Sequence, residues 1–145
     1  MTESVSGTRY VAVSFLSGLL FVIMDGLIHA NPFARKLFEA YQPLARTSVN
    51  APAGLAIDLA YGFLLTGLFL LLFRSLPGDT SLVRGISFGA MVWIFRVAMG
   101  VAGEWMILKV PVSVHAYRLF TGLGEMLVLG AIMGFAFRRQ ITQHG

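Results

Sequence analysis

Four long apolar stretches, separated by short polar segments, dominate the hydrophobic pattern of the chain. They run over about residues 10–30, 52–73, 82–108 and 113–137. Each is long enough to cross roughly 30 Å of hydrocarbon as an α-helix that rises about 1.5 Å per residue. The pattern therefore predicts an all-α membrane protein, a four transmembrane helix bundle that forms a single transmembrane domain over residues 1–145.

A short interfacial amphipathic helix is predicted between spans 1 and 2, over residues 33–42. Asn31 is a favourable N-cap, and Pro32 suits the first helical turn. Aromatic and leucine side chains share one face of this segment, whereas its charged side chains lie elsewhere. Such a pattern is typical of a helix in the plane of the membrane interface. Pro43 is expected to end it.

The composition excludes an ordinary water-soluble fold. Hydrophobic residues make up 57% of the chain and charged residues 12%, against roughly a quarter charged in soluble domains. The net charge is +4, but the basic residues are scattered, which argues against a nucleic-acid partner and leaves the lipid bilayer as the expected one. The chain has no cysteine, which excludes disulfides and thiolate metal ligands.

The two sides of the predicted bundle carry similar positive charge. Side A holds the termini and the turn at residues 76–79, and side B holds residues 31–51 and 109–112. Five basic residues lie on each side, so the positive-inside rule does not decide the orientation. The Arg138–Arg139 pair and the shortest loop favour cytoplasmic termini, in a multi-pass protein of the cell membrane.

Four of the seven acidic residues fall inside predicted spans: Asp25, Asp58, Glu104 and Glu125. A charge near the bilayer centre costs roughly 2.5–3.5 kcal/mol even on the mildest insertion scale. These carboxylates are therefore expected to face the interior of the bundle rather than lipid.

Depth along the helices predicts a carboxylate and imidazole cluster near side B. At 1.5 Å per residue, five ionisable residues lie within roughly 10 Å of that interface, and each span supplies at least one. Their helical phases allow all of them to face the bundle axis. We therefore expect a ligand or ion cluster that consists of Asp25, His29, Asp58, Glu104 and His115.

A mid-membrane ion pair is predicted between Arg96 and Glu125. Each lies about 12 residues from the side-B end of its span, on adjacent helices joined by a short turn. Arginine suits such a pair because its planar guanidinium can bind a carboxylate through two hydrogen bonds.

The side-B cluster has more than one chemical interpretation. Three carboxylates and two imidazoles could hold a divalent metal such as Zn²⁺, Mn²⁺ or iron. Carboxylate metal sites in helix bundles use a Glu-x-x-His spacing, however, whereas Asp25 and His29 are four residues apart. A hydrated polar vestibule near the headgroups is the favoured alternative. Haem is disfavoured, because the acids beside His29 and His115 do not suit an apolar porphyrin pocket.

No catalytic residue is assigned. A Ser-His-Asp set, a phosphate-binding loop and a zinc-protease motif are all missing from the sequence.

Small-residue motifs occur on the last two spans, at Gly85 and Gly89 and at Gly130 and Gly134. They allow close helix approach, either at a homodimer face or inside the bundle. We favour packing inside the bundle because such motifs are common in membrane spans.

Two segments resemble a group of small, uncharacterised four-span bacterial membrane proteins, a domain of unknown function. The first is DGLIHANPFARKLFEAYQPL (residues 25–44), and the second is WMILKVPVSVHAYRLFTGLGEMLVLG (residues 105–130). An aromatic residue usually follows the first-span aspartate closely in that group, whereas residues 26–28 are Gly, Leu and Ile here. The resemblance implies the four-span architecture and brings no activity with it.

Three hypotheses for function follow. The first is that the polar core binds or passes a small cation, a proton or a polar ligand. The second is a structural or accessory subunit, in a homo-oligomer or a larger membrane complex, whose charges serve helix association. The third is a membrane metalloenzyme that uses the side-B cluster.

Overall fold

A computed structural model describes residues 6–48 and 50–141, apart from the side chains of 139–141. All regular elements in these residues are helical. Four helical segments are long and apolar enough to cross a membrane: Gly7–Ala30, Ala51–Ser75, Ser81–Ile107 and Val112–Arg138. The predicted all-α fold with four membrane-spanning helices is confirmed, and the protein is an integral membrane protein.

The spans differ in their internal regularity. The first is α1 (Gly7–Ala30), and the second is α3 (Ala51–Leu72) with a final 3₁₀ turn, η2 (Phe73–Ser75). The third consists of α4 (Ser81–Trp93), a π-helical turn η3 (Ile94–Ala98) and α5 (Met99–Ile107). The fourth is α6 (Val112–Ile141).

The segment between the first two spans folds as α2 (Pro32–Phe38) followed by a 3₁₀ helix, η1 (Glu39–Leu44). The Asn31 side chain accepts a hydrogen bond from the Ala34 amide at 2.9 Å, which separates α2 from α1 as predicted. The expectation that Pro43 ends the helix is wrong, because Pro43 lies inside η1. Pro43 has no N–H to donate, and the last turn of η1 closes with the Ala45 N–H donating to the Gln42 carbonyl at 3.2 Å.

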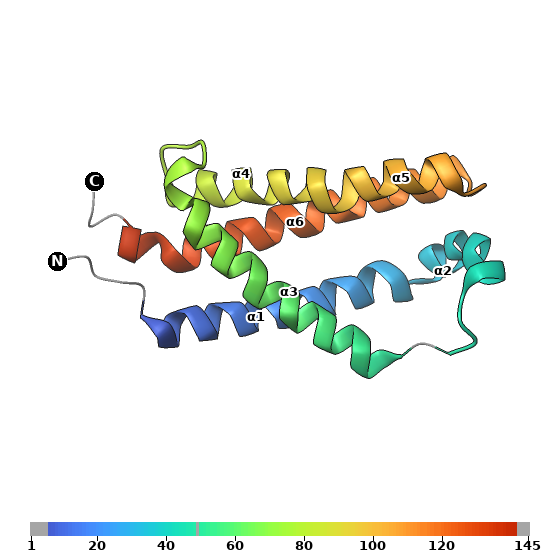
Figure 1. Cartoon of the computed structure of the whole chain (residues 1–145), viewed down its shortest axis with the longest axis horizontal. Helices are drawn as coiled ribbons and strands as arrows, with labels where there is room; N and C mark the ends of the chain where they lie inside the picture. Colours follow the sequence, from blue (N-terminus) through green and yellow to red (C-terminus); the bar gives the residue numbers. More distant parts are fainter. Residues whose placement is uncertain (1–5, 49, 142–145) are drawn as a thin grey trace.

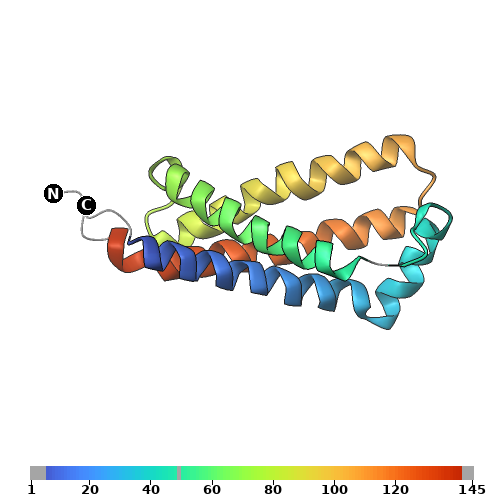
Figure 2. The same cartoon turned by 60° about the horizontal axis from the view of Figure 1, so that its bottom comes forward.

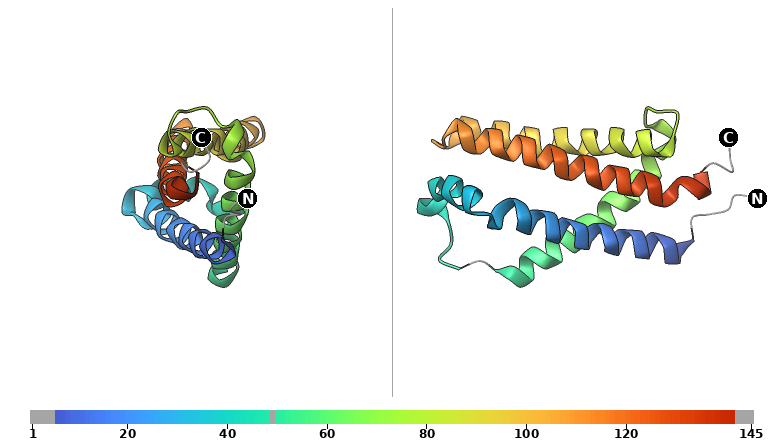
Figure 3. Two further views of the ribbon diagram at one scale, coloured as in Figure 1. Left: turned by 90° about the vertical axis from the view of Figure 1, so that its left-hand side faces the viewer. Right: turned by 180° about the vertical axis from the view of Figure 1, so that it is seen from behind.

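The helices form two closely packed pairs, α1 with α3 and α4 with α6 (Figure 1). Contacts between α1 and α6 join the two pairs. Helix α3 crosses α1 at a steep angle, which the view from behind shows as well (Figure 3). The first turn of α1 and the last turn of α6 lie at the same end of the bundle, as an even number of crossings requires.

Glycine makes the close approach within each pair possible. A Cβ atom on Gly62 of α3 would overlap the backbone of Gly18 and Ser14 on α1. On the other pair, a Cβ atom on Gly85 or Gly130 would overlap the carbonyl group of the opposite glycine. The glycine motifs of the last two spans therefore pack against each other inside the bundle.

Aromatic side chains close the side-A half of the bundle. The Phe69 ring meets the rings of Phe73 and Phe88 at 5.4 Å each and that of Phe137 at 6.2 Å. Arg9 of α1 donates a hydrogen bond to the Ala136 carbonyl of α6. These contacts fill the space between the two pairs at the side-A end.

The side-B half is open by comparison. Helix α5 diverges from α6 toward side B (Figure 2). The first turns of α3, residues 51–57, are exposed throughout. Asp25, Asp58 and Glu104 belong to this half of the spans.

We predict that Gly130→Ala destabilises the protein by about 1–3 kcal/mol, because the added methyl group forces α4 and α6 apart. Gly124→Ala on the same helix is the matched control, since a Cβ atom there meets no other helix within 4 Å among the described residues. Unfolding of both variants in detergent would measure the difference. Equal stability of the two variants would contradict the close packing of α4 on α6.

Candidate functional site

Arg96 is the point at which all four spans meet. It lies in the middle of the π-helical turn η3, a type of distortion that is frequent at functional sites. Its guanidinium carbon lies 5.1 Å from the ring centroid of Phe21 on α1 and 4.5 Å from that of Tyr61 on α3. Its Nη1 atom lies 3.7 Å from Oε2 of Glu125 on α6.

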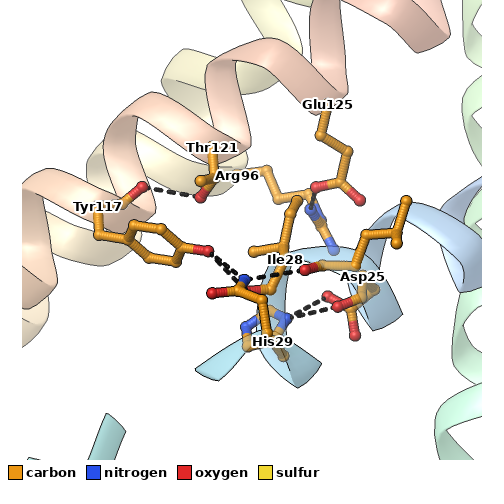
Figure 4. Close-up of polar contacts among 9 residues, drawn as sticks. Asp25, Ile28, His29, Arg96, Tyr117, Thr121 and Glu125 are labelled. Atoms are coloured by element: carbon orange, nitrogen blue, oxygen red, sulfur yellow. Dashed lines mark hydrogen bonds and ion pairs between the residues drawn. The ribbon is translucent and has the colours of Figure 1, made fainter. Parts of the chain in front are cut away.

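Glu125 is the most deeply buried acid of this region. Its side chain is 6% exposed, against 30% for Arg96, and Figure 4 shows the two side chains next to each other. The 3.7 Å distance to Arg96 is longer than a charge-assisted hydrogen bond, which measures about 2.7–2.9 Å. Its other oxygen, Oε1, is buried without a hydrogen-bond partner among the described residues. The pairing of Glu125 is therefore incomplete.

Asp25 and His29 form a second pair one helical turn apart on α1. The Nδ1 atom of His29 lies 3.1 Å from the Asp25 carboxylate and 2.9 Å from the Asp25 carbonyl oxygen, so Nδ1 carries the proton. The imidazole ring stacks on Phe38 of α2 at 5.0 Å. Both side chains are half-exposed, and Figure 4 shows them on α1 beside Arg96 and Glu125.

Asp58 of α3 completes this group. It interacts electrostatically with Asp25, His29 and Arg96, and Glu125 interacts with the same three residues and with Asp58. Asp58 makes no direct hydrogen bond or ion pair within the described part of the chain. We call these five residues the Arg96 group: Asp25, His29, Asp58, Arg96 and Glu125.

A separate group lies at the side-B mouth of the bundle, formed by Tyr41, Glu104 and Arg118; we call it the side-B triad. The Tyr41 hydroxyl donates to Oε2 of Glu104 at 2.8 Å. Arg118 of α6 donates to the same carboxylate and, at 3.1 Å, to the Tyr41 oxygen. The triad connects η1, α5 and α6.

His115 lies near the side-B triad and interacts electrostatically with Glu104. It is 4% exposed, and neither ring nitrogen has a hydrogen-bond partner among the described residues.

The structure thus divides the predicted side-B cluster. Asp25, His29 and Asp58 join the Arg96–Glu125 pair, whereas Glu104 pairs with Arg118 and Tyr41, with His115 nearby. Depth placed Glu104 level with the two aspartates, but its own neighbours on η1 and α6 occupy its carboxylate. No three acidic or histidine side chains in the described residues come together closely enough to hold a metal ion. The described residues therefore offer no set of side chains for the divalent metal that was one interpretation of the cluster.

The aromatic contacts of Arg96 and the role of Tyr41 were not predicted. Tyr61 shares a helix face with Asp58, and this spacing could have indicated a ring beside the polar group. Glu104 and Arg118 lie at similar depths on adjacent spans, the same signal that paired Arg96 with Glu125.

Comparison of the chain with family models, with curated proteins and with solved structures finds no match. Its function is therefore inferred from the contacts of the two groups.

We predict that Arg96 and Glu125 are energetically coupled. Arg96→Met should cost about 3–5 kcal/mol, because it strands a buried carboxylate. Glu125→Gln should cost less, because Arg96 keeps two other carboxylates within electrostatic range. The double variant should lose less than the sum of the two single losses, as measured by unfolding in detergent.

The combination of Arg96→Met with Glu104→Gln provides the matched control. Glu104 belongs to the side-B triad, so these two losses should add to within about 0.5 kcal/mol. Strict additivity of the Arg96 and Glu125 variants would show that the pair is not coupled.

Tyr41 should titrate above its ordinary pKa of 10.0, because burial and the hydrogen bond to Glu104 both raise its pKa. The protonated phenol then contributes stability that is present in full below pH 10 and is lost as the pH rises through the higher folded-state pKa. Subtracting the tyrosinate absorbance titration of Tyr41→Phe from that of the unmodified protein isolates this group. A difference curve centred below pH 10 would contradict the contact with Glu104.

Proposed function

We propose that this membrane protein binds a small cation in the Arg96 group and admits it from side B. The charge balance of the group supports the proposal. Three carboxylates face one guanidinium and one imidazole, and the imidazole is already hydrogen-bonded to Asp25. The group therefore carries more negative than positive charge whenever its acids are ionised and His29 is neutral.

The proposal rests mainly on two carboxylate groups whose oxygen atoms lack direct partners. Asp58 has no direct partner in the described residues, and Oε1 of Glu125 is buried without one. An uncompensated carboxylate in a low-dielectric environment is costly, and it is stabilised by taking up a proton or by binding a cation. The group is thus suited to accept positive charge from outside.

Access supports entry from side B. The aromatic contacts around Phe69 close the side-A half, whereas His29 of the group lines a pocket on side B together with residues of α2 and η1. Asp25 and His29, at the side-B edge of the group, are half-exposed. A cation that enters through this pocket meets His29 and Asp25 before the rest of the group. Passage across the membrane would require the aromatic contacts to separate.

A subunit of a larger assembly is the second candidate, on a different observation. Residues 51–57 of α3 are exposed on every face of the helix, so this turn of the span is open to lipid or to another membrane protein. A second copy or another membrane protein that packs there would bury this face.

We expect purified protein to show saturable thermal stabilisation by a cation at constant ionic strength. The probes are sodium, potassium, methylammonium and methylguanidinium chlorides. Each is measured at two pH values, because stabilisation at the lower pH would identify the proton as the bound cation. Asp58→Asn and Glu125→Gln should each weaken the apparent affinity about tenfold or more, equivalent to about 1.4 kcal/mol.

Asp79→Asn is the matched control, because Asp79 lies in the exposed turn at side A. Its response to each cation should equal that of the unmodified protein. Failure of every cation, protons included, to stabilise the unmodified protein would refute the proposal, and so would an equal loss of response in Asp79→Asn.

A further inference from the structure

Two aromatic rings lie beside the Arg96 group. Phe21 of α1 and Tyr61 of α3 have ring centroids 5.8 Å apart and planes inclined by 35°. The guanidinium carbon of Arg96 lies 5.1 Å from one centroid and 4.5 Å from the other. Both distances are within the roughly 6 Å at which a cation is attracted to a ring face.

The chemistry of these rings favours one class of cation. A guanidinium group is planar, delocalised and weakly hydrated, so it stacks on aromatic rings while it pairs with a carboxylate. A compact ion such as sodium or calcium requires several converging oxygen ligands. No three acidic or histidine side chains converge in the described part of the chain. The site therefore suits a planar organic cation better than a metal ion.

Arg96 holds this position only loosely. Its 3.7 Å separation from Glu125 is too long for a hydrogen bond, and Glu125 Oε1 has no hydrogen-bond partner in the described part of the chain. Asp25 and Asp58 lie within electrostatic range of Arg96. An Arg96 side chain that leaves the rings can therefore move toward other carboxylates without losing all compensation of its charge.

We propose that the core selects planar organic cations of the guanidinium class, and that Arg96 is a tethered occupant which the ligand displaces from Phe21, Tyr61 and Glu125. The proposal rests on the cation binding proposed above and names the class of cation. The exchange is non-covalent: one planar cation replaces another beside the same carboxylate and the same two rings.

Removing the tethered occupant provides the test. Arg96→Ala vacates the position, and methylguanidinium should restore thermal stability with a saturable rise of about 5 °C. Methylammonium at the same concentration and ionic strength should give less than a quarter of that rise. Arg118→Ala is the matched control, because Arg118 also pairs with a carboxylate but no cation–π contact with a ring is found for it among the described residues. Methylguanidinium should not restore that variant.

Equal restoration of Arg96→Ala by the two cations would overturn the proposal, and so would restoration of Arg118→Ala to the same extent. Should Arg96→Ala not fold, affinities of the unmodified protein and of Tyr61→Leu decide the question. The unmodified protein should bind methylguanidinium at least tenfold more tightly than methylammonium, and Tyr61→Leu should lose most of that preference. An unchanged preference in Tyr61→Leu would refute the role of the ring.

The two proposals fail in distinguishable ways. Cation binding that depends on Asp58 and Glu125 but shows no preference for the planar cation would overturn the ligand class and leave the proposed function standing. An unmodified protein that binds no cation, together with an Arg96→Ala variant that methylguanidinium does not restore, would overturn both.

Discussion

The cost of a charge inside the membrane is the constraint on which the rest of this structure depends. Arg96 and Glu125 lie in membrane-spanning helices, where an isolated charge is expensive. The protein meets this cost by bringing all four spans to one point: Glu125 supplies the opposite charge, and Phe21 and Tyr61 supply ring faces. The close glycine contacts of each helix pair position the helices that carry these side chains.

The same constraint explains why there are two polar groups. Arg118 lies nearer to side B than Arg96 and needs its own compensation, which Glu104 and Tyr41 provide. Tyr41 belongs to η1, so this contact also holds the interfacial segment against the ends of α5 and α6. At the same end of the bundle, the Tyr117 hydroxyl of α6 donates a hydrogen bond to the Ile28 carbonyl of α1 at 2.7 Å, which joins these two helices (Figure 4). The interfacial segment is thereby part of the polar architecture.

Much of the fold could be predicted from the sequence because hydrophobic length and capping residues act locally. Asn31 and Pro32 show where α2 begins, and four apolar runs show where the spans lie. Depth along the helices also predicts that Arg96 and Glu125 lie at the same level, and the structure brings these two side chains together. Depth and helical phase do not show which helices approach at each level, however. Glu104 was therefore grouped with Asp25 and Asp58, whereas its partners come from η1 and α6. The ring contacts of Arg96 depend on the steep crossing of α3 over α1, which has no local signature.

The π-helical turn η3 allows one span to serve two different packing requirements. A π turn accommodates one residue more than the α-helix around it, and one residue corresponds to about 100° of rotation. The orientation of α4 is determined by Gly85 and Gly89 against α6, while that of α5 must direct Glu104 toward Arg118. Because η3 lies between them, the two halves of the third span need not keep a common helical phase. Winding η3 as a regular α-helix with all of its residues kept would restore that phase and turn Glu104 away from its partners, although no residue of either contact would have changed.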